Sequence, residues 1–158
     1  MKALVVYDSF FSNTEKIAQA IGEALRPQGE VGIFRVADIK VEQVAGVEVF
    51  IVGSPTRGFR PTPAIRDFLK SIPRNGLQGV RVAAFDTRIA VQDVDNRFLH
   101  TMVRLFGYAA KPIADLLQKK GGELCLPPEG FIVKDTEGPL KEGELERAAE
   151  WARGLVGK

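Results

Sequence analysis

The sequence lacks the residues that would support a disulfide or a cysteine-based metal site. Its 158 residues include a single cysteine, Cys125, so no intramolecular disulfide and no cage of cysteine ligands can form. The formal net charge of +2 gives no reason to expect nucleic-acid binding. The apolar run at the N-terminus stops at Asp8 and is too short for a signal peptide or a membrane span. We therefore expect a cytoplasmic protein that binds neither membrane nor nucleic acid.

Repeats, low-complexity segments and interdomain linkers are also missing from the chain. The composition, 45% hydrophobic and 27% charged, is that of an ordinary globular protein. The length suits one domain, so we expect residues 1–158 to form a single unit.

Strand-like apolar runs alternate with amphipathic helical runs along the chain. The predicted strands cover residues 3–7, 31–36, 47–52, 80–85 and 123–133, the last interrupted by two prolines. Helical spacing of apolar residues follows in 15–25, 63–72, 98–106, 113–117 and 145–156, with a weak turn at 41–44. This alternation predicts an α/β protein, a three-layer α/β/α sandwich around a five-stranded parallel sheet.

Three loops leave the carboxyl ends of the predicted strands: 8–14, 54–61 and 86–95. Ligands of such sheets bind outside these ends, where the strand order reverses. The first loop places Ser9, Ser12, Asn13 and Thr14 where a helix begins, and a helix N-terminus favours phosphate through its N–H groups and its dipole. The alternative is purely structural, because Ser12 and Glu15 also fit a capping box.

The three loops together resemble those of the flavodoxin family. The segment YDSFFSNTEKIA resembles its phosphate loop, while VGSPT and FDTR resemble the two loops that grip the flavin ring. The similarity runs from Lys2 to the C-terminal helix. It implies FMN as cofactor, a sheet ordered 2-1-3-4-5, and electron transfer. By position, it implies an FMN site made of Ser9, Phe10, Phe11, Ser12, Asn13, Thr14, Pro55, Thr56, Arg57, Gly58, Phe59, Thr87 and Arg88.

Two features depart from the pattern of that family. Ser12 occupies the position of a phosphate-loop glycine, where the backbone takes a positive φ or lets the ligand approach closely. Aromatic residues to sandwich the flavin are few, and Phe59 is the one stacking candidate near the site, with Tyr7, Tyr108 and Trp151 elsewhere. Both features predict weak FMN binding.

The resemblance implies an electron carrier or a small flavin-dependent reductase, serving a redox partner protein or a quinone-like substrate. No side chain is assigned a catalytic role. Arg57, Arg60 and Arg88 lie in the predicted ligand loops, and cations there would stabilise the negative charge of reduced FMN. We therefore predict a higher midpoint potential than acidic flavodoxins have.

Three other functions share this architecture. A receiver domain needs an acidic cluster after the first strand and an aspartate after the third, but the third strand ends in Gly53 and Ser54. A low-molecular-weight tyrosine phosphatase needs a cysteine in the first loop, and none is there. A scaffold of this fold that has weakened or lost FMN binding remains as the alternative.

Three further residues are given packing roles. His100 lies beside the apolar stripe of a predicted helix and has no convincing catalytic partner. Cys125 is predicted to be buried in the last strand, as a small hydrophobic residue. Trp151 is predicted to pack on the flank of the last helix.

Overall fold

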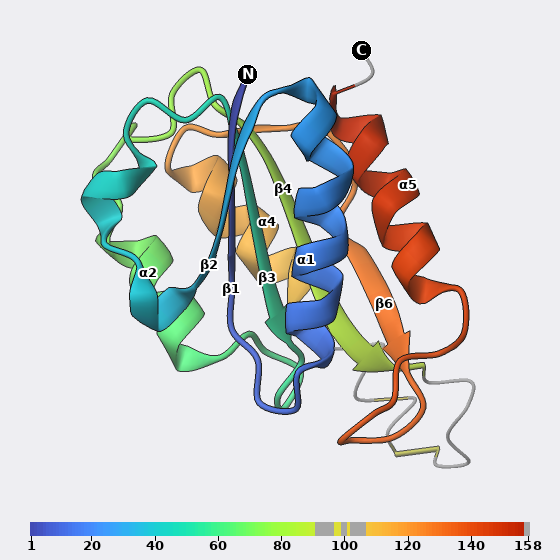
Figure 1. Cartoon of the computed structure of the whole chain (residues 1–158). Helices are drawn as coiled ribbons and strands as arrows, with labels where there is room; N and C mark the ends of the chain where they lie inside the picture. The colour runs from blue at the N-terminus through green and yellow to red at the C-terminus, as the bar shows by residue number, and fades with distance from the viewer. Residues whose placement is uncertain (91–96, 99–100, 102–106, 157–158) are drawn as a thin grey trace.

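The computed structural model describes residues 1–90, 97–98, 101 and 107–156. Its centre is a twisted parallel sheet with strand order β2-β1-β3-β4-β5, in which β6 also pairs with β4 (Figure 1). The strands are β1 (Lys2–Tyr7), β2 (Glu30–Arg35), β3 (Val49–Pro55), β4 (Arg81–Ile89), β5 (Glu123–Leu124) and β6 (Glu129–Val133). The predicted α/β sandwich and the order 2-1-3-4-5 are confirmed.

Two short strands occupy the fifth position of the sheet, where the sequence predicts one interrupted strand. Strand β5 pairs with Arg81 and Val82, and β6 pairs with the five residues from Phe85 to Ile89. Pro127 and Pro128 separate the two strands, because proline has no N–H to donate to a ladder.

Strand β4 is longer than predicted. The sequence ends this strand at Phe85, but Asp86, Thr87 and Arg88 continue it. Asp86 and Thr87 pair with Ser54 and Pro55 of β3 on one side, and all three residues pair with β6 on the other. These polar residues are therefore held in the sheet and not in a loop.

Helices cover both faces of the sheet. Helices α1 (Asn13–Leu25) and α5 (Glu144–Val156) lie side by side on the near face in Figure 1, and α2 (Pro63–Ser71) and α4 (Ala110–Lys119) lie on the other. Short 3₁₀ turns follow α1 and join β2 to β3: η1 (Arg26–Gln28), η2 (Val36–Asp38) and η3 (Val41–Val44), the last confirming the predicted turn. Most of the predicted helix 98–106, with His100, lies outside the described residues.

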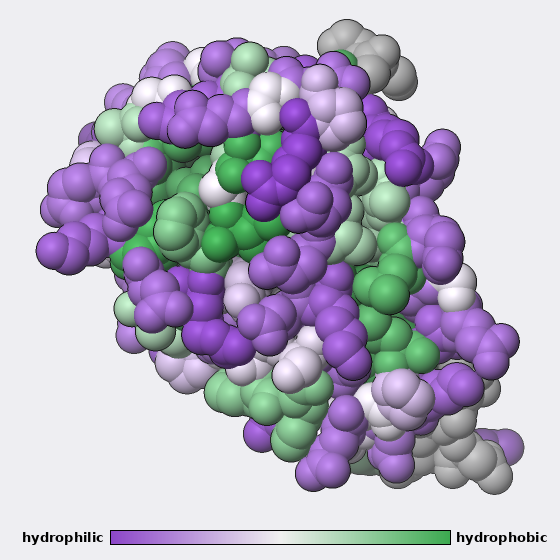
Figure 2. Space-filling view, in the orientation of Figure 1, coloured by the Kyte–Doolittle hydropathy of each residue, from purple (hydrophilic) through white to green (hydrophobic). Residues whose placement is uncertain are grey.

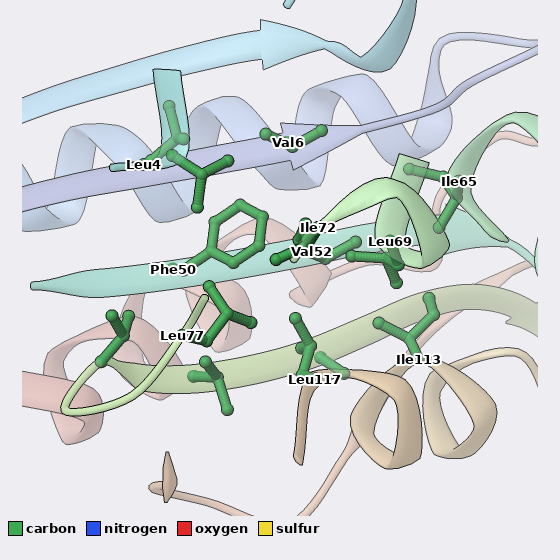
Figure 3. Packing of buried hydrophobic residues seen from close by; sticks show 14 of the residues in the cluster. Leu4, Val6, Phe50, Val52, Ile65, Leu69, Ile72, Leu77, Ile113 and Leu117 are labelled. Atoms are coloured by element: carbon green, nitrogen blue, oxygen red, sulfur yellow. The ribbon is translucent and has the colours of Figure 1, made fainter. Parts of the chain in front are cut away.

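Each face of the sheet has its own apolar core. On the α2 and α4 side, Phe50 and Val52 of β3 pack beneath Leu69 of α2 and Leu117 of α4 (Figure 3). All four side chains are fully buried. Burying a side chain of this size stabilises the fold by roughly 1.5–3 kcal/mol.

On the α1 and α5 side, three aromatic rings meet edge to face. The ring centroids of Phe85, Phe131 and Trp151 lie 5.9–6.2 Å apart, as aromatic pairs prefer. The predicted packing role of Trp151 is confirmed. The prediction that Cys125 is buried in a strand is wrong: β5 ends at Leu124, and Cys125 is half-buried, although it packs against this core.

Within the described part of the chain, the helices are too short or too polar for any of them to span a membrane.

Candidate functional site

A cavity of about 110 Å³ opens at the carboxyl ends of β1, β3, β4 and β6. Ten of the predicted site residues line it: Ser9, Phe10, Phe11, Asn13, Thr14, Pro55, Thr56, Arg57, Thr87 and Arg88. The other three predicted residues, Ser12, Gly58 and Phe59, lie in the same loops but do not line the cavity. Segments about 40 residues apart in the sequence therefore converge on one place.

Three lining residues were not predicted: Ile89, Val133 and Thr136. Ile89 ends β4, and Val133 ends β6. All parallel strands of a sheet have their carboxyl ends at the same edge, so the loop after β6 lies at the ligand edge as the first three loops do. Val133 and Thr136 could have been predicted from their place at the end of this strand and just after it.

The first loop turns at Ser12, whose backbone has a left-handed φ of 68°. The structural alternative, a capping box at Ser12 and Glu15, is not formed, because the Ser12 side chain makes no capping hydrogen bond. The N–H of Glu15 is donated instead to the Ser9 hydroxyl at 3.4 Å, so Ser9 takes the capping role.

We expect the substitution Ser12→Gly to raise the free energy of unfolding by about 1 kcal/mol. An L-residue in the left-handed region carries a steric cost that glycine avoids. Urea unfolding followed by circular dichroism measures the change. Ser71→Gly is the matched control: Ser71 ends helix α2, so glycine there should lower stability by roughly 0.5 kcal/mol. Destabilisation by Ser12→Gly would contradict the strain argument.

Behind this loop, a buried tyrosine and an arginine hold the loop in position. Tyr7 donates its hydroxyl hydrogen to a Glu15 carboxylate oxygen at 2.8 Å. Arg35, at the end of β2, donates to the Ser9 carbonyl at 2.7 Å, and its guanidinium lies 3.6 Å from Glu15 and 5.4 Å from the Tyr7 ring centroid. Burial of Tyr7 and its hydrogen bond to Glu15 raise the pKa of its hydroxyl to about 12.

We expect stability to fall in alkali through Tyr7. Its pKa is 10.0 when unperturbed and about 12 here, so the unfolded chain loses this proton first. The contribution is complete below pH 10 and is lost as the pH rises toward 12. Urea unfolding at pH 8 and pH 11 should show a smaller alkaline loss for Tyr7→Phe than for the unchanged chain. Equal losses in both proteins would contradict this assignment.

Hydrogen bonds tie the converging segments to one another. The hydroxyls of Thr14 and Thr87 lie 2.8 Å apart, and both residues are buried. Asn13 donates its side-chain amide to the Glu137 carbonyl at 3.1 Å, and the N–H of Thr56 is donated to the Thr87 carbonyl at 3.0 Å. The start of α1, the end of β4 and the loops after β3 and β6 therefore form one bonded framework around the cavity.

The second loop folds into a tight turn between Arg57 and Arg60. The two residues exchange backbone hydrogen bonds of 2.8 and 3.0 Å, and Gly58 and Phe59 take left-handed φ values of 55° and 68°. The Arg57 guanidinium lies 5.0 Å from the centroid of the Phe10 ring. This cation–π contact links the second loop to the first.

An apolar rim borders the cavity. Phe10 and Phe11 are 55% and 41% exposed, which is uncommon for adjacent phenylalanines. Figure 2 shows an apolar patch at the lower end of the molecule, where the β1–α1 loop lies in Figure 1.

The charge of Arg88 is matched by a buried carboxylate that sequence reasoning missed. Asp86 is fully buried and accepts two hydrogen bonds from Arg88, at 2.6 and 2.7 Å, and one from the N–H of Ala110 at 2.9 Å. Burial raises the pKa of Asp86, while the hydrogen bonds and charge of Arg88 oppose that rise. The guanidinium also lies 3.7 Å from the centroid of the Tyr108 ring.

This cluster corrects two expectations. Arg88 lines the cavity, but it does so as half of an ion pair and not as a free cation. Tyr108 lies at the edge of the site, although the sequence placed it away from the ligand. Gly130 leaves room for this arrangement, since a Cβ there would overlap the Arg88 guanidinium. Arg60, the third predicted arginine, does not line this cavity.

Structural comparison identifies the fold. Flavodoxin 2 from Bacillus cereus matches with a TM-score of 0.79 at 24% identity, covering 99% of each chain. A flavodoxin from the domain Archaea matches with a TM-score of 0.79 at 22% identity, over 99% of this chain and 97% of the other. Rubredoxin oxygen:oxidoreductase from Desulfovibrio gigas matches with a TM-score of 0.73 at 22% identity, but this chain covers 35% of it. The chain has the flavodoxin fold.

Comparison of sequences does not identify a family, because no family model matches the chain. An uncharacterized protein of Methanocaldococcus jannaschii is 36% identical over 73 residues, which are 43% of this chain and 19% of that protein. The match therefore spans less than a fifth of that relative.

Proposed function

We propose that this chain of flavodoxin fold is an FMN-binding redox protein, an electron carrier or a small flavin-dependent reductase. The observation that carries the proposal is the convergence of ten predicted residues, from three separate segments, on one cavity beside the first turn of α1. The same segments carry the sequence resemblance to flavodoxins, so the sequence, the fold and the cavity support the same function.

The residues present fit the phosphate of a mononucleotide. The first N–H groups of a helix have no partner within the helix, and its dipole favours an anion. Ser9, Asn13 and Thr14 bring small polar side chains to this end of α1. They would hold the phosphate, and Pro55, Thr56 and Arg57 would lie along the ring. When bound, FMN would supply the electron-accepting ring, and the protein its orientation and its electrostatic surroundings.

Titration with FMN and with riboflavin tests the proposal. Flavin fluorescence should be quenched on addition of the protein, and FMN should bind more tightly than riboflavin, because only FMN carries the phosphate. Binding of neither flavin would overturn the proposal. Equal affinity for both would overturn the assignment of the phosphate to the first turn of α1.

A scaffold without flavin is the second candidate, and two observations favour it. Ser12 occupies a left-handed position that glycine would take without strain. The cavity of about 110 Å³ is also below the range of roughly 300–1,000 Å³ of most ligand pockets. A colourless protein that leaves FMN fluorescence unchanged would favour this candidate.

The electrons would pass to a redox partner protein or a small quinone-like substrate. The exposed pair Phe10 and Phe11 supports an exchange surface at the rim, since exposed aromatics mark contact sites. Steady-state oxidation of the reduced holoprotein by menadione separates the two roles. Fast turnover supports a reductase, and slow turnover supports a carrier.

We expect a higher midpoint potential than acidic flavodoxins have, with Arg57 as the cause. Arg57 lines the cavity and is exposed, whereas the charge of Arg88 is matched by Asp86. Arg57→Gln should lower the potential of the bound flavin by roughly 20–60 mV per electron, as one lost cation near a reduced ring would. Arg60→Gln, which removes the same charge outside the cavity, is the control. Redox titration measures both, and equal shifts would contradict the role of Arg57.

A further inference from the structure

A second cavity, of about 350 Å³, lies between α2 and α4, on the face of the sheet opposite α1 and α5 (Figure 1). We propose that it binds a small organic anion, with the acidic group held by Arg66 and Lys70 and an apolar body resting between the helices. Its described lining consists of Arg60, Pro61, Arg66, Lys70, Pro112, Asp115 and Leu116. This site is distinct from the candidate FMN site and does not depend on the proposed function.

Positive charge dominates the lining. Three of the lining residues are basic and one, Asp115, is acidic. Asp115 already lies 3.4 Å from the ammonium of Lys111, on the same helix. The carboxylate of Asp67 lies 3.8 Å from Nε of Arg66, which is within ion-pair range but beyond a hydrogen bond. The cavity therefore has an excess of cations that the neighbouring carboxylates do not match.

Arg66 provides a second, independent observation. Its Nε is buried and has no hydrogen-bond partner, although its side chain as a whole is 42% exposed. A buried donor without an acceptor costs roughly 1–3 kcal/mol, and a charged one costs more. An anion in the cavity would place a negative charge beside this guanidinium and would offset the cost of burying its Nε.

The N-terminal ends of α2 and α4 add to the positive charge at this cavity, and an anion would offset that charge. The part of the cavity at Arg66 and Pro112 lies near the N-terminal ends of α2 and α4, where the helix dipole is positive. Neither helix has an acidic residue in its first turn. Asp86 satisfies the N–H of Ala110 at the start of α4, but α2 has no such carboxylate and is capped by the neutral Thr62. A helix start without an acidic residue in its first turn departs from the usual pattern, and such departures are typical of functional sites.

The remaining lining indicates the body of the ligand. Pro61 is buried, and Pro112 and Leu116 are half-buried, so the cavity offers apolar surface beside its cations. Its volume lies within the range of pockets that enclose organic ligands. An apolar body with one carboxylate or phosphate group therefore fits better than an inorganic ion.

The test uses flavin-free protein, so its result is independent of FMN binding. The probes are 1-naphthoate and 1-naphthyl phosphate, with affinities from calorimetry and contacts from ¹⁵N chemical shifts. Both should shift amides of α2 and α4 around Arg66 and Leu116. The double variant Arg66→Gln with Lys70→Gln should bind at least 10-fold more weakly, with an unchanged circular dichroism spectrum.

The control removes the same two charges elsewhere. Arg74, which follows α2, and Lys119, in the last turn of α4, are both exposed and do not line the cavity. The double variant Arg74→Gln with Lys119→Gln should keep its affinity within about twofold. An equal loss in both double variants would overturn the proposal, because the effect would then be that of net charge. Inorganic phosphate binding as tightly as 1-naphthyl phosphate would also overturn it, since the apolar body would then contribute nothing.

Discussion

The substitution Asp86→Ala is expected to lower the free energy of unfolding by about 3 kcal/mol. Removing one partner of a buried ion pair leaves the other charge without compensation, which costs roughly 3–5 kcal/mol. We expect the lower end of that range, since the Arg88 side chain is 20% exposed and can partly rehydrate. The N–H of Ala110 also loses its acceptor, which loosens the start of α4.

Urea unfolding at pH 7 measures the effect, with Asp115→Ala as the matched control. Asp115 is an exposed aspartate paired with Lys111 at 3.4 Å, and such pairs contribute about 0.3–0.5 kcal/mol. The double variant Asp86→Ala with Arg88→Met should be less destabilised than the sum of its single variants, because it removes both charges. Losses of equal size at Asp86 and Asp115 would show that the buried cluster does not hold the edge of the site.

The second large effect is expected for Ser9→Asp: a loss of FMN affinity of at least about 100-fold. The Ser9 hydroxyl lines the cavity and accepts the N–H of Glu15 at 3.4 Å. An aspartate can accept the same N–H, and a negative charge near a helix N-terminus stabilises the helix. The same charge would repel the phosphate. At about 4 Å, the repulsion between two unit charges is about 4 kcal/mol at an effective dielectric constant of 20.

Two comparisons separate charge from shape at Ser9. Ser9→Ala removes the hydroxyl without adding charge, so it should weaken FMN binding by no more than about 10-fold. Riboflavin has no phosphate, and its affinity should be nearly the same for Ser9→Asp as for the unchanged chain. Fluorescence titration measures all five affinities, three for FMN and two for riboflavin. If Ser9→Asp bound FMN as tightly as the unchanged chain does, the phosphate would not lie beside Ser9.

Much of the site was predictable because its residues follow strands in the sequence. Ser9, Thr14, Thr56 and Thr87 lie at the end of an apolar strand or in the segment that follows it, and the carboxyl ends of parallel strands meet at one edge of the sheet. The resemblance to flavodoxins was found in these same segments and did not depend on the tertiary structure. By contrast, the alternative of a capping box at Ser12 came from local spacing alone, and the structure does not form it, because Ser12 has a left-handed backbone and makes no capping hydrogen bond.

The residues that escaped prediction act over long separations. Asp86 accepts from the N–H of Ala110, and Arg88 lies over the Tyr108 ring, only because the start of α4 packs against the end of β4. Arg66 and Leu116 line one cavity only because α2 and α4 lie beside each other. The spacing of residues along the sequence does not predict such contacts between separate helices and strands.

The sequence by itself determined the alternation of strands and helices, the parallel sheet and the edge where the ligand loops gather, because apolar periodicity and turn residues are local properties. The tertiary structure alone decided which charged groups are buried. It buries Asp86 beside Arg88, and it buries Nε of Arg66 without a hydrogen-bond partner, since desolvation depends on neighbours that only the packed chain brings together.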